Sequence, residues 1–188
     1  TGLGDSVADV MIDLETLDVT PGCVILTIGA VKFDPHGSGH TAQYDVRPSV
    51  DEQCELGRVV NDDTIAWWAR QNAAAKEEAF TEQGRIGFYD AILGLQKFCW
   101  NERAVWAHGS CFDIIIIENA MRQLGINIPW NFWAVRDTRT LFEVANVRTA
   151  DDGLSTSHRA VDDAARQALT VQRAYQRLKL VDHRVNLS

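Results

Sequence analysis

Two carboxylates stand one residue apart at the end of an apolar run near the start of the chain. Residues 10–12 are apolar and lead directly into Asp13, and Glu15 follows after one leucine. In a β-strand alternate side chains point to opposite faces, so Asp13 and Glu15 would project together from one face. Two like charges side by side repel each other, and a hard divalent cation between them removes that repulsion. The spacing indicates either a site for Mg²⁺ or Mn²⁺ or a polar strand end that faces solvent.

Two further carboxylates and a histidine lie where other elements should reach the same edge. Asp113 opens a predicted helix shortly after an apolar strand at 104–107, and Asp163 lies early in the last predicted helix. His158 precedes Asp163 by five residues, where a polar loop enters that helix. Taken singly, Asp113 could be a helix cap, Asp163 a solvated charge and His158 a structural residue. Their order along alternating strands and helices predicts that the carboxylates converge at one edge of a sheet.

Three segments that carry these residues resemble the three exonuclease motifs of the DEDDh family. They are residues 12–16 (IDLET), 107–113 (AHGSCFD) and 158–164 (HRAVDDA). The resemblance extends from residue 10 to about residue 175 and is strongest to compact RNase T-like exonucleases of bacteria and their phages. Histidine five residues before the last aspartate distinguishes this subgroup from the one that has tyrosine. Position 108 is His where many relatives have Asn, so the partner of His108 could be a substrate phosphate or a neighbouring backbone group.

The resemblance implies an RNase H-like α/β fold and 3′-5′ hydrolysis of nucleic acid by two ions of Mg²⁺ or Mn²⁺. Asp13 would bridge the ions, Glu15 and Asp163 would complete the first site, and Asp113 would hold the second. His158 would accept the proton of the attacking water, a role that suits an imidazole near neutral pH. The residues expected to contact substrate are Thr16, Leu17, His108, Phe112 and Trp68.

The expected substrate is the 3′ end of a single strand, released as nucleoside 5′-monophosphates. The net charge of −8, from 26 acidic and 18 basic side chains, argues against a broad basic footprint on a duplex. We expect DNA slightly ahead of RNA because the resemblance is phage-like, and an exoribonuclease is the alternative. A non-catalytic protein that binds nucleic-acid ends would need a broken acidic set, and none of these positions is broken. Four arginines near the last motif could guide the strand or be ordinary surface charges: Arg136, Arg139, Arg148 and Arg159.

The elements that must position these residues follow from apolar patterns and turn signals. Segments 10–16, 23–33 and 41–46 predict an antiparallel meander, and two further strands at 104–107 and 132–135 complete a mixed five-stranded sheet flanked by helices. Helices are predicted around 62–69 and over 73–80, 88–100, 113–124, 138–145 and 158–178. Residues 48–61 are predicted to be irregular. Of the adjacent Trp67 and Trp68, one is expected in the core and one on a groove wall, where it could stack on a base.

The chain has the length of one domain. It is 188 residues long and 46% hydrophobic, which predicts a single domain over 1–188 with its core at about 8–178. No apolar run approaches the roughly 20 residues that cross a bilayer. The four scattered cysteines lack the spacing of a zinc site or a disulfide framework. We therefore expect a cytoplasmic enzyme without a membrane partner, either monomeric or homodimeric.

Overall fold

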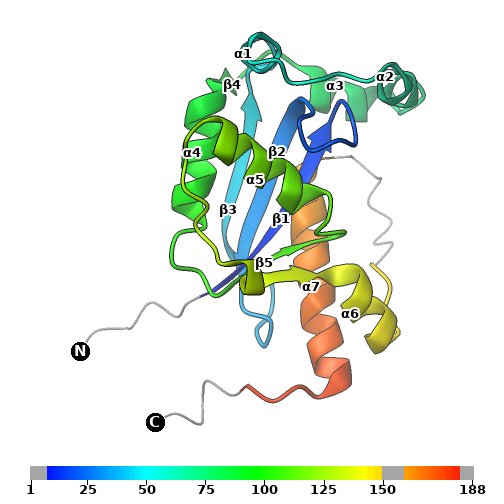
Figure 1. Cartoon of the computed structure of the whole chain (residues 1–188). Helices are drawn as coiled ribbons and strands as arrows, with labels where there is room; N and C mark the ends of the chain where they lie inside the picture. The colour runs from blue at the N-terminus through cyan, green and yellow to red at the C-terminus, as the bar shows by residue number, and fades with distance from the viewer. Residues whose placement is uncertain (1–7, 150–158, 183–188) are drawn as a thin grey trace.

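A mixed sheet of six strands forms the centre of the molecule (Figure 1). The computed structural model describes residues 8–149 and 159–182. The strands are β1 (Asp9–Thr16), β2 (Ile25–Phe33), β3 (His40–Pro48), β4 (Arg85–Ile86), β5 (Ala104–Ala107) and β6 (Val135–Asp137), in the order β4-β3-β2-β1-β5-β6. The predicted meander is present as β1 to β3, and β5 and β6 run parallel to β1. The sixth strand, β4, was not expected because two residues are too few to show alternation.

Helices cover both faces of the sheet and one of its ends. They are α1 (Val50–Glu55), α2 (Asp62–Ala69), α3 (Ala73–Phe80), α4 (Phe88–Phe98), α5 (Asp113–Gln123), α6 (Thr138–Ala145) and α7 (Ala160–Leu178). The helices α4 and α5 lie on one face, α6 and α7 on the other, and α1 to α3 at the end where β1 finishes (Figure 1). No helix in the described ranges has the length and apolarity to span a membrane.

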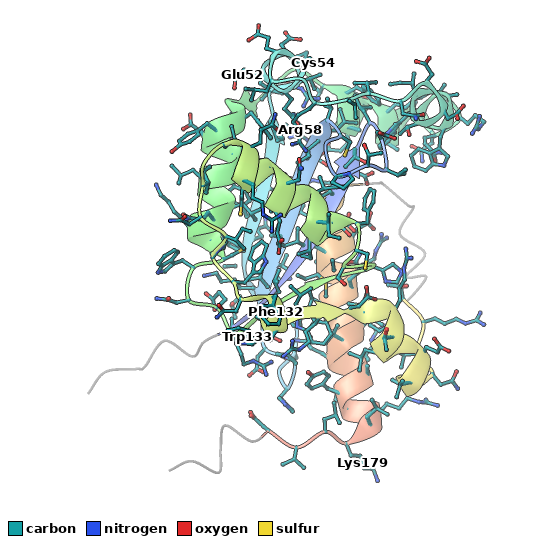
Figure 2. All side chains as sticks on the ribbon, viewed as in Figure 1. Glu52, Cys54, Arg58, Phe132, Trp133 and Lys179 are labelled. Carbon is teal, nitrogen blue, oxygen red and sulfur yellow. The ribbon has the colours of Figure 1, made fainter. Side chains whose placement is uncertain are left out.

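Two predicted segments differ from the structure. Residues 50–55 form α1 instead of irregular chain, and this helix depends on a tertiary contact: the buried Gln53 amide hydrogen-bonds both backbone groups of Ile25, at 2.8 and 2.9 Å. The strand predicted at 132–135 is instead the short 3-10 helix η1 (Phe132–Ala134) followed by β6. Phe132 and Trp133 are 84% and 63% exposed on η1 (Figure 2). The prediction of a strand here was wrong because it took these apolar side chains to be buried.

Alternation along β1 assigns its side chains to the two cores. Val10 and Ile12 pack with α4 and α5, whereas Met11 packs with α6 and α7. Because side chains repeat every two residues in a strand, Asp13 and Glu15 project on the same face as Met11. The carboxylates of β1 are therefore directed toward α7.

Gly29 on β2 lets the start of α7 lie directly on the sheet. A Cβ at Gly29 would lie 2.1 Å from the backbone nitrogen of Val161 and 2.2 Å from the carbonyl carbon of Ala160. Gly29 is also the residue that pairs with Asp13 across the β1–β2 ladder. The absence of a side chain at this position brings the first turn of α7, and with it Asp163, next to Asp13.

Candidate active site

Carboxylates from three elements meet where β1 ends and where α5 and α7 begin. Asp13 and Glu15 of β1 and Asp163 of α7 each offer an oxygen atom, and these atoms lie within 4.8 Å of one another. Asp113, the first residue of α5, is 4% exposed and accepts a hydrogen bond from the backbone nitrogen of Leu14 at 3.1 Å. The structure thus brings together the acidic residues that the sequence places far apart.

Burial and mutual repulsion keep these carboxyls hard to ionise. Burial raises the pKa of Glu15 to about 8, and the charge of Asp113 adds to that rise. Burial likewise raises the pKa of Asp113 to about 7. The pKa of Asp13 is raised well above its ordinary value by burial and then by its two acidic neighbours. A divalent cation offsets both causes, and a ligand set made only of carboxylate oxygens suits Mg²⁺ or Mn²⁺.

Two residues of α7 hold the carboxylates in place. Gln167 is 7% exposed and donates from Nε2 to Asp13 Oδ1 at 2.8 Å, and Arg166 forms an ion pair with Asp163. Neither residue was predicted from the sequence. The available signal was their spacing, because residues three and four positions after Asp163 share its face of a helix. Such partners fix the orientation of ligating side chains.

A cavity opens beside Glu15, between the end of β1 and α2. Its volume is about 510 Å³, within the range usual for small-molecule sites. It is lined by Leu14, Glu15, Thr16, Asp18, Val19, Asn61, Asp63, Thr64, Trp67, Trp68 and Phe112. The wall combines aromatic faces with hydrogen-bonding groups, and a nucleoside has the same two kinds of surface.

The adjacent tryptophans divide as expected between core and groove wall, and both line the cavity. Trp68 is 2% exposed, and its indole N–H donates to the carbonyl oxygen of Thr16 at 3.0 Å. Trp67 is 39% exposed and lies edge-to-face against Trp68, with ring centroids 5.0 Å apart. Trp68 therefore supports the end of β1, and Trp67 is the more exposed of the two aromatic side chains at the cavity.

Leu17 and His108 were predicted to contact substrate, but neither lines this cavity. Leu17 is 5% exposed and packs with Trp68 in a core cluster, whereas Leu14 lines the cavity in its place. His108 is half-buried, and its Nδ1 lies 2.8 Å from the hydroxyl of Thr138. The partner of His108 is thus a side chain at the start of α6. Thr16, Trp68 and Phe112, the remaining predicted contacts, all line the cavity.

The predicted proton acceptor, His158, lies outside the described residues, so its role stays a prediction. The chain is described again from Arg159, which caps the start of α7. Arg159 pairs with Asp45 at 2.5 Å and with Glu78 at 3.4 Å.

Comparison with known proteins identifies the family. The family described as the 3′-5′ exoribonuclease Rv2179c-like domain matches residues 8–175. The chain belongs to this family. It is a 3′-5′ exonuclease, as the three motifs predict. An exodeoxyribonuclease of Enterobacteria phage T4 is 24% identical to this exonuclease over an alignment of 202 positions, gaps included, that covers 88% of each chain.

Solved structures share the fold of this exonuclease. The zinc-bound complex of Escherichia coli exonuclease I with single-stranded DNA superposes with a TM-score of 0.67 at 10% identity, over 94% of this chain and 42% of the other. The same enzyme with a dA16 oligonucleotide gives a TM-score of 0.66 at 12% identity, over 93% and 42%. The chain therefore spans less than half the length of these enzymes. The likeness confirms the predicted α/β exonuclease fold.

Proposed function

We propose that this exonuclease removes nucleotides one at a time from the 3′ end of single-stranded nucleic acid, with two divalent ions held by its carboxylates. The observation that carries the proposal is the convergence of Asp13, Glu15 and Asp163, within 4.8 Å of one another, beside a cavity of nucleoside size. The sheet places the acidic cluster and the cavity on the same end of β1, so a bound nucleotide could present its phosphate to the carboxylates.

Each carboxylate has a role that follows from its position. Asp13 lies among the other acidic groups and would bridge two ions, with Glu15 and Asp163 on one and Asp113 on the other. Bound there, Mg²⁺ or Mn²⁺ would supply an activated water and stabilise the leaving oxygen. Gln167 and Arg166 orient the carboxylates of Asp13 and Asp163. We assign acceptance of the water proton to His158.

The cavity would hold the terminal nucleoside. Trp67 and Phe112 offer aromatic faces for the base, and Leu14 offers an apolar contact between them and the carboxylates. The backbone of Thr16 is held by the Trp68 indole, so its groups keep a fixed position at the cavity wall. Stacking tolerates any base, which supports a substrate defined by its free end instead of its sequence.

We propose that both RNA and DNA strands are substrates. The family is named for an exoribonuclease, whereas the phage relative is named an exodeoxyribonuclease. RNA is distinguished from DNA through its 2′-hydroxyl, and the polar part of the cavity wall, with Asn61 and Thr64, offers groups that could contact it.

The test is digestion of end-labelled single strands of RNA and DNA with the same sequence, in Mg²⁺, in Mn²⁺ and in EDTA. We expect mononucleotides from the 3′ terminus in either metal, none in EDTA, and none from the Asp13→Ala variant. A circular single strand should survive. Release from the 5′ end or cutting of the circle would overturn the proposal, and full turnover by Asp13→Ala would overturn the metal mechanism.

A further inference from the structure

The structure separates the four arginines near the last motif. Arg159 is engaged by Asp45 and Glu78. Arg136 donates to the carbonyl oxygens of Trp133 and Val135, at 2.5 and 3.0 Å, toward the end of β6 that is distant from α6. Arg148 is exposed beyond the far end of α6. Arg139, on the first turn of α6, lies against Gly109, in the turn that precedes Asp113.

The guanidinium of Arg139 lies against the turn that leads into Asp113. A Cβ at Gly109 would lie 3.2 Å from Arg139 Cζ and 3.4 Å from its Nη2, and Gly109 has a φ of 105° that suits glycine. Burial and then Arg139 lower the pKa of His108. The guanidinium therefore lies next to the turn that positions Asp113 at the start of α5.

The side chains of Asp137 and Thr138 hold the start of α6 against this turn. Asp137 accepts from the backbone nitrogen of Ser110 at 2.6 Å and from that of Arg139 at 2.8 Å. The Thr138 hydroxyl lies 2.8 Å from His108 Nδ1. The backbone of Arg139 is therefore held in place, while its side chain is exposed and, within the described ranges, forms no ion pair.

The carboxylates lie between the cavity and α6. The cavity borders α2, beyond the end of β1, and α6 lies on the other side of the start of α5 (Figure 1). A strand with its terminal nucleoside in the cavity and its scissile phosphate at Asp13 would continue toward α6. We propose that Arg139 binds the phosphate on the 5′ side of the scissile one, an inference that rests on the proposed function.

A cation at this point answers a physical need of the site. The protein carries a net charge of −8, and the acidic cluster repels every phosphate that no metal ion neutralises. The planar guanidinium can donate two parallel hydrogen bonds to one phosphate, which a lysine cannot reproduce. Arg139 would thus hold the strand in register with the carboxylates.

The test uses two single strands that differ at one phosphate. In one of them a neutral methylphosphonate replaces the phosphate on the 5′ side of the terminal scissile linkage. For each strand, kcat/KM for release of the first nucleotide is measured with the wild type, Arg139→Gln, Arg139→Lys and the control Arg136→Gln. In the wild type the methylphosphonate should lower kcat/KM about 10- to 100-fold, as expected for loss of one charged hydrogen-bonded contact.

We expect the effects of the Arg139 substitution and of the methylphosphonate on kcat/KM to depend on each other. Arg139→Gln should lose about the same factor on the natural strand, and the methylphosphonate should then lower its rate less than about 3-fold further. Arg139→Lys should recover part of the loss, and Arg136→Gln should behave as wild type. Normal kcat/KM in Arg139→Gln, or an undiminished methylphosphonate effect in that variant, would overturn the role of Arg139. Absence of wild-type hydrolysis would instead overturn the proposed function itself.

Discussion

Asp162 and Asp163 are neighbours in the sequence but have different surroundings. The Asp163 side chain is 17% exposed and belongs to the acidic cluster, whereas that of Asp162 is 52% exposed and lies 4.0 Å from Arg159. Asp163→Asn should abolish metal-dependent hydrolysis, because one ligand oxygen loses its charge. Asp162→Asn should retain wild-type turnover. Turnover and Mn²⁺ binding measured on both variants check the pair, and equal activity of the two would contradict the assignment of Asp163 as a ligand.

His158 is predicted to accept a proton and not to bind metal. His158→Ala should lower kcat by about 10²- to 10⁴-fold, the usual contribution of a general base, with metal affinity nearly unchanged. Rapid-quench kinetics together with a Mn²⁺ titration separate the two quantities. A parallel loss of metal affinity would make His158 a ligand instead.

Residue types and spacing were enough to predict the carboxylates, but not the side chains around them. The alternation that aligns Asp13 with Glu15 stops directly after Glu15, where the pairing of β1 with β2 shifts register. Beyond that irregularity the direction of Leu17 could not be read from the sequence. Gln167 was missed for another reason: its hydrogen bond to Asp13 forms only because α7 lies close to β1, which the sequence does not show.

At the scale of elements, α2 carries two tryptophans with separable roles. Trp67→Ala should raise KM about 10-fold, since stacking on one base contributes about 1–3 kcal/mol, and should leave the unfolding free energy nearly unchanged. Trp68→Ala should instead destabilise the fold by about 3–5 kcal/mol, because it empties a buried site and removes the hydrogen bond to Thr16. Urea unfolding and initial rates distinguish the two variants, and a reversed pattern would return the stacking role to Trp68.

Elements with a clear apolar pattern were predictable, including the four-residue strand β5, whereas α1 and β4 were not. The helix at α5 was predicted despite its run of four isoleucines, because Asp113 opens it and Gly125, at a φ of 67°, follows its end. By contrast, α1 has six residues and β4 has two, and both form through contacts with distant segments. Arg85 of β4, for example, donates to the carbonyl oxygens of Leu26 and Pro48, at 3.1 and 2.9 Å. Such contacts leave no periodic signal in the sequence.

For the whole molecule, stability without metal should depend on pH in a direction set by the acidic cluster. The pKa values of Glu15, about 8, and of Asp113, about 7, lie above their ordinary values of 4.5 and 3.8. The folded state therefore binds more protons than the unfolded chain between these limits, and the free energy of unfolding falls as pH rises through this range. In EDTA the melting temperature should decrease from about pH 5 to pH 8.

Added Mg²⁺ or Mn²⁺ should restore that stability, and more at pH 8 than at pH 6, because metal competes with protons for the same oxygens. Glu15→Gln should weaken the pH dependence in EDTA, and Asp162→Asn should leave it unchanged. Thermal unfolding across this series measures the effect. A metal-free protein that becomes more stable between pH 5 and pH 8 would contradict the pKa shifts of Glu15 and Asp113.

Gly29 should influence which divalent ion fits between the carboxylates. Its single hydrogen allows α7 to lie against β2, and that contact sets how far Asp163 stands from Asp13. Oxygen ligands surround Mg²⁺ at about 2.0–2.1 Å and Ca²⁺ at about 2.3–2.6 Å. Gly29→Ala should lift the helix and widen the site, so calorimetric titration should show affinity shifting from Mg²⁺ toward Ca²⁺. A methyl group that touches no ligand would then determine which cation this enzyme can use.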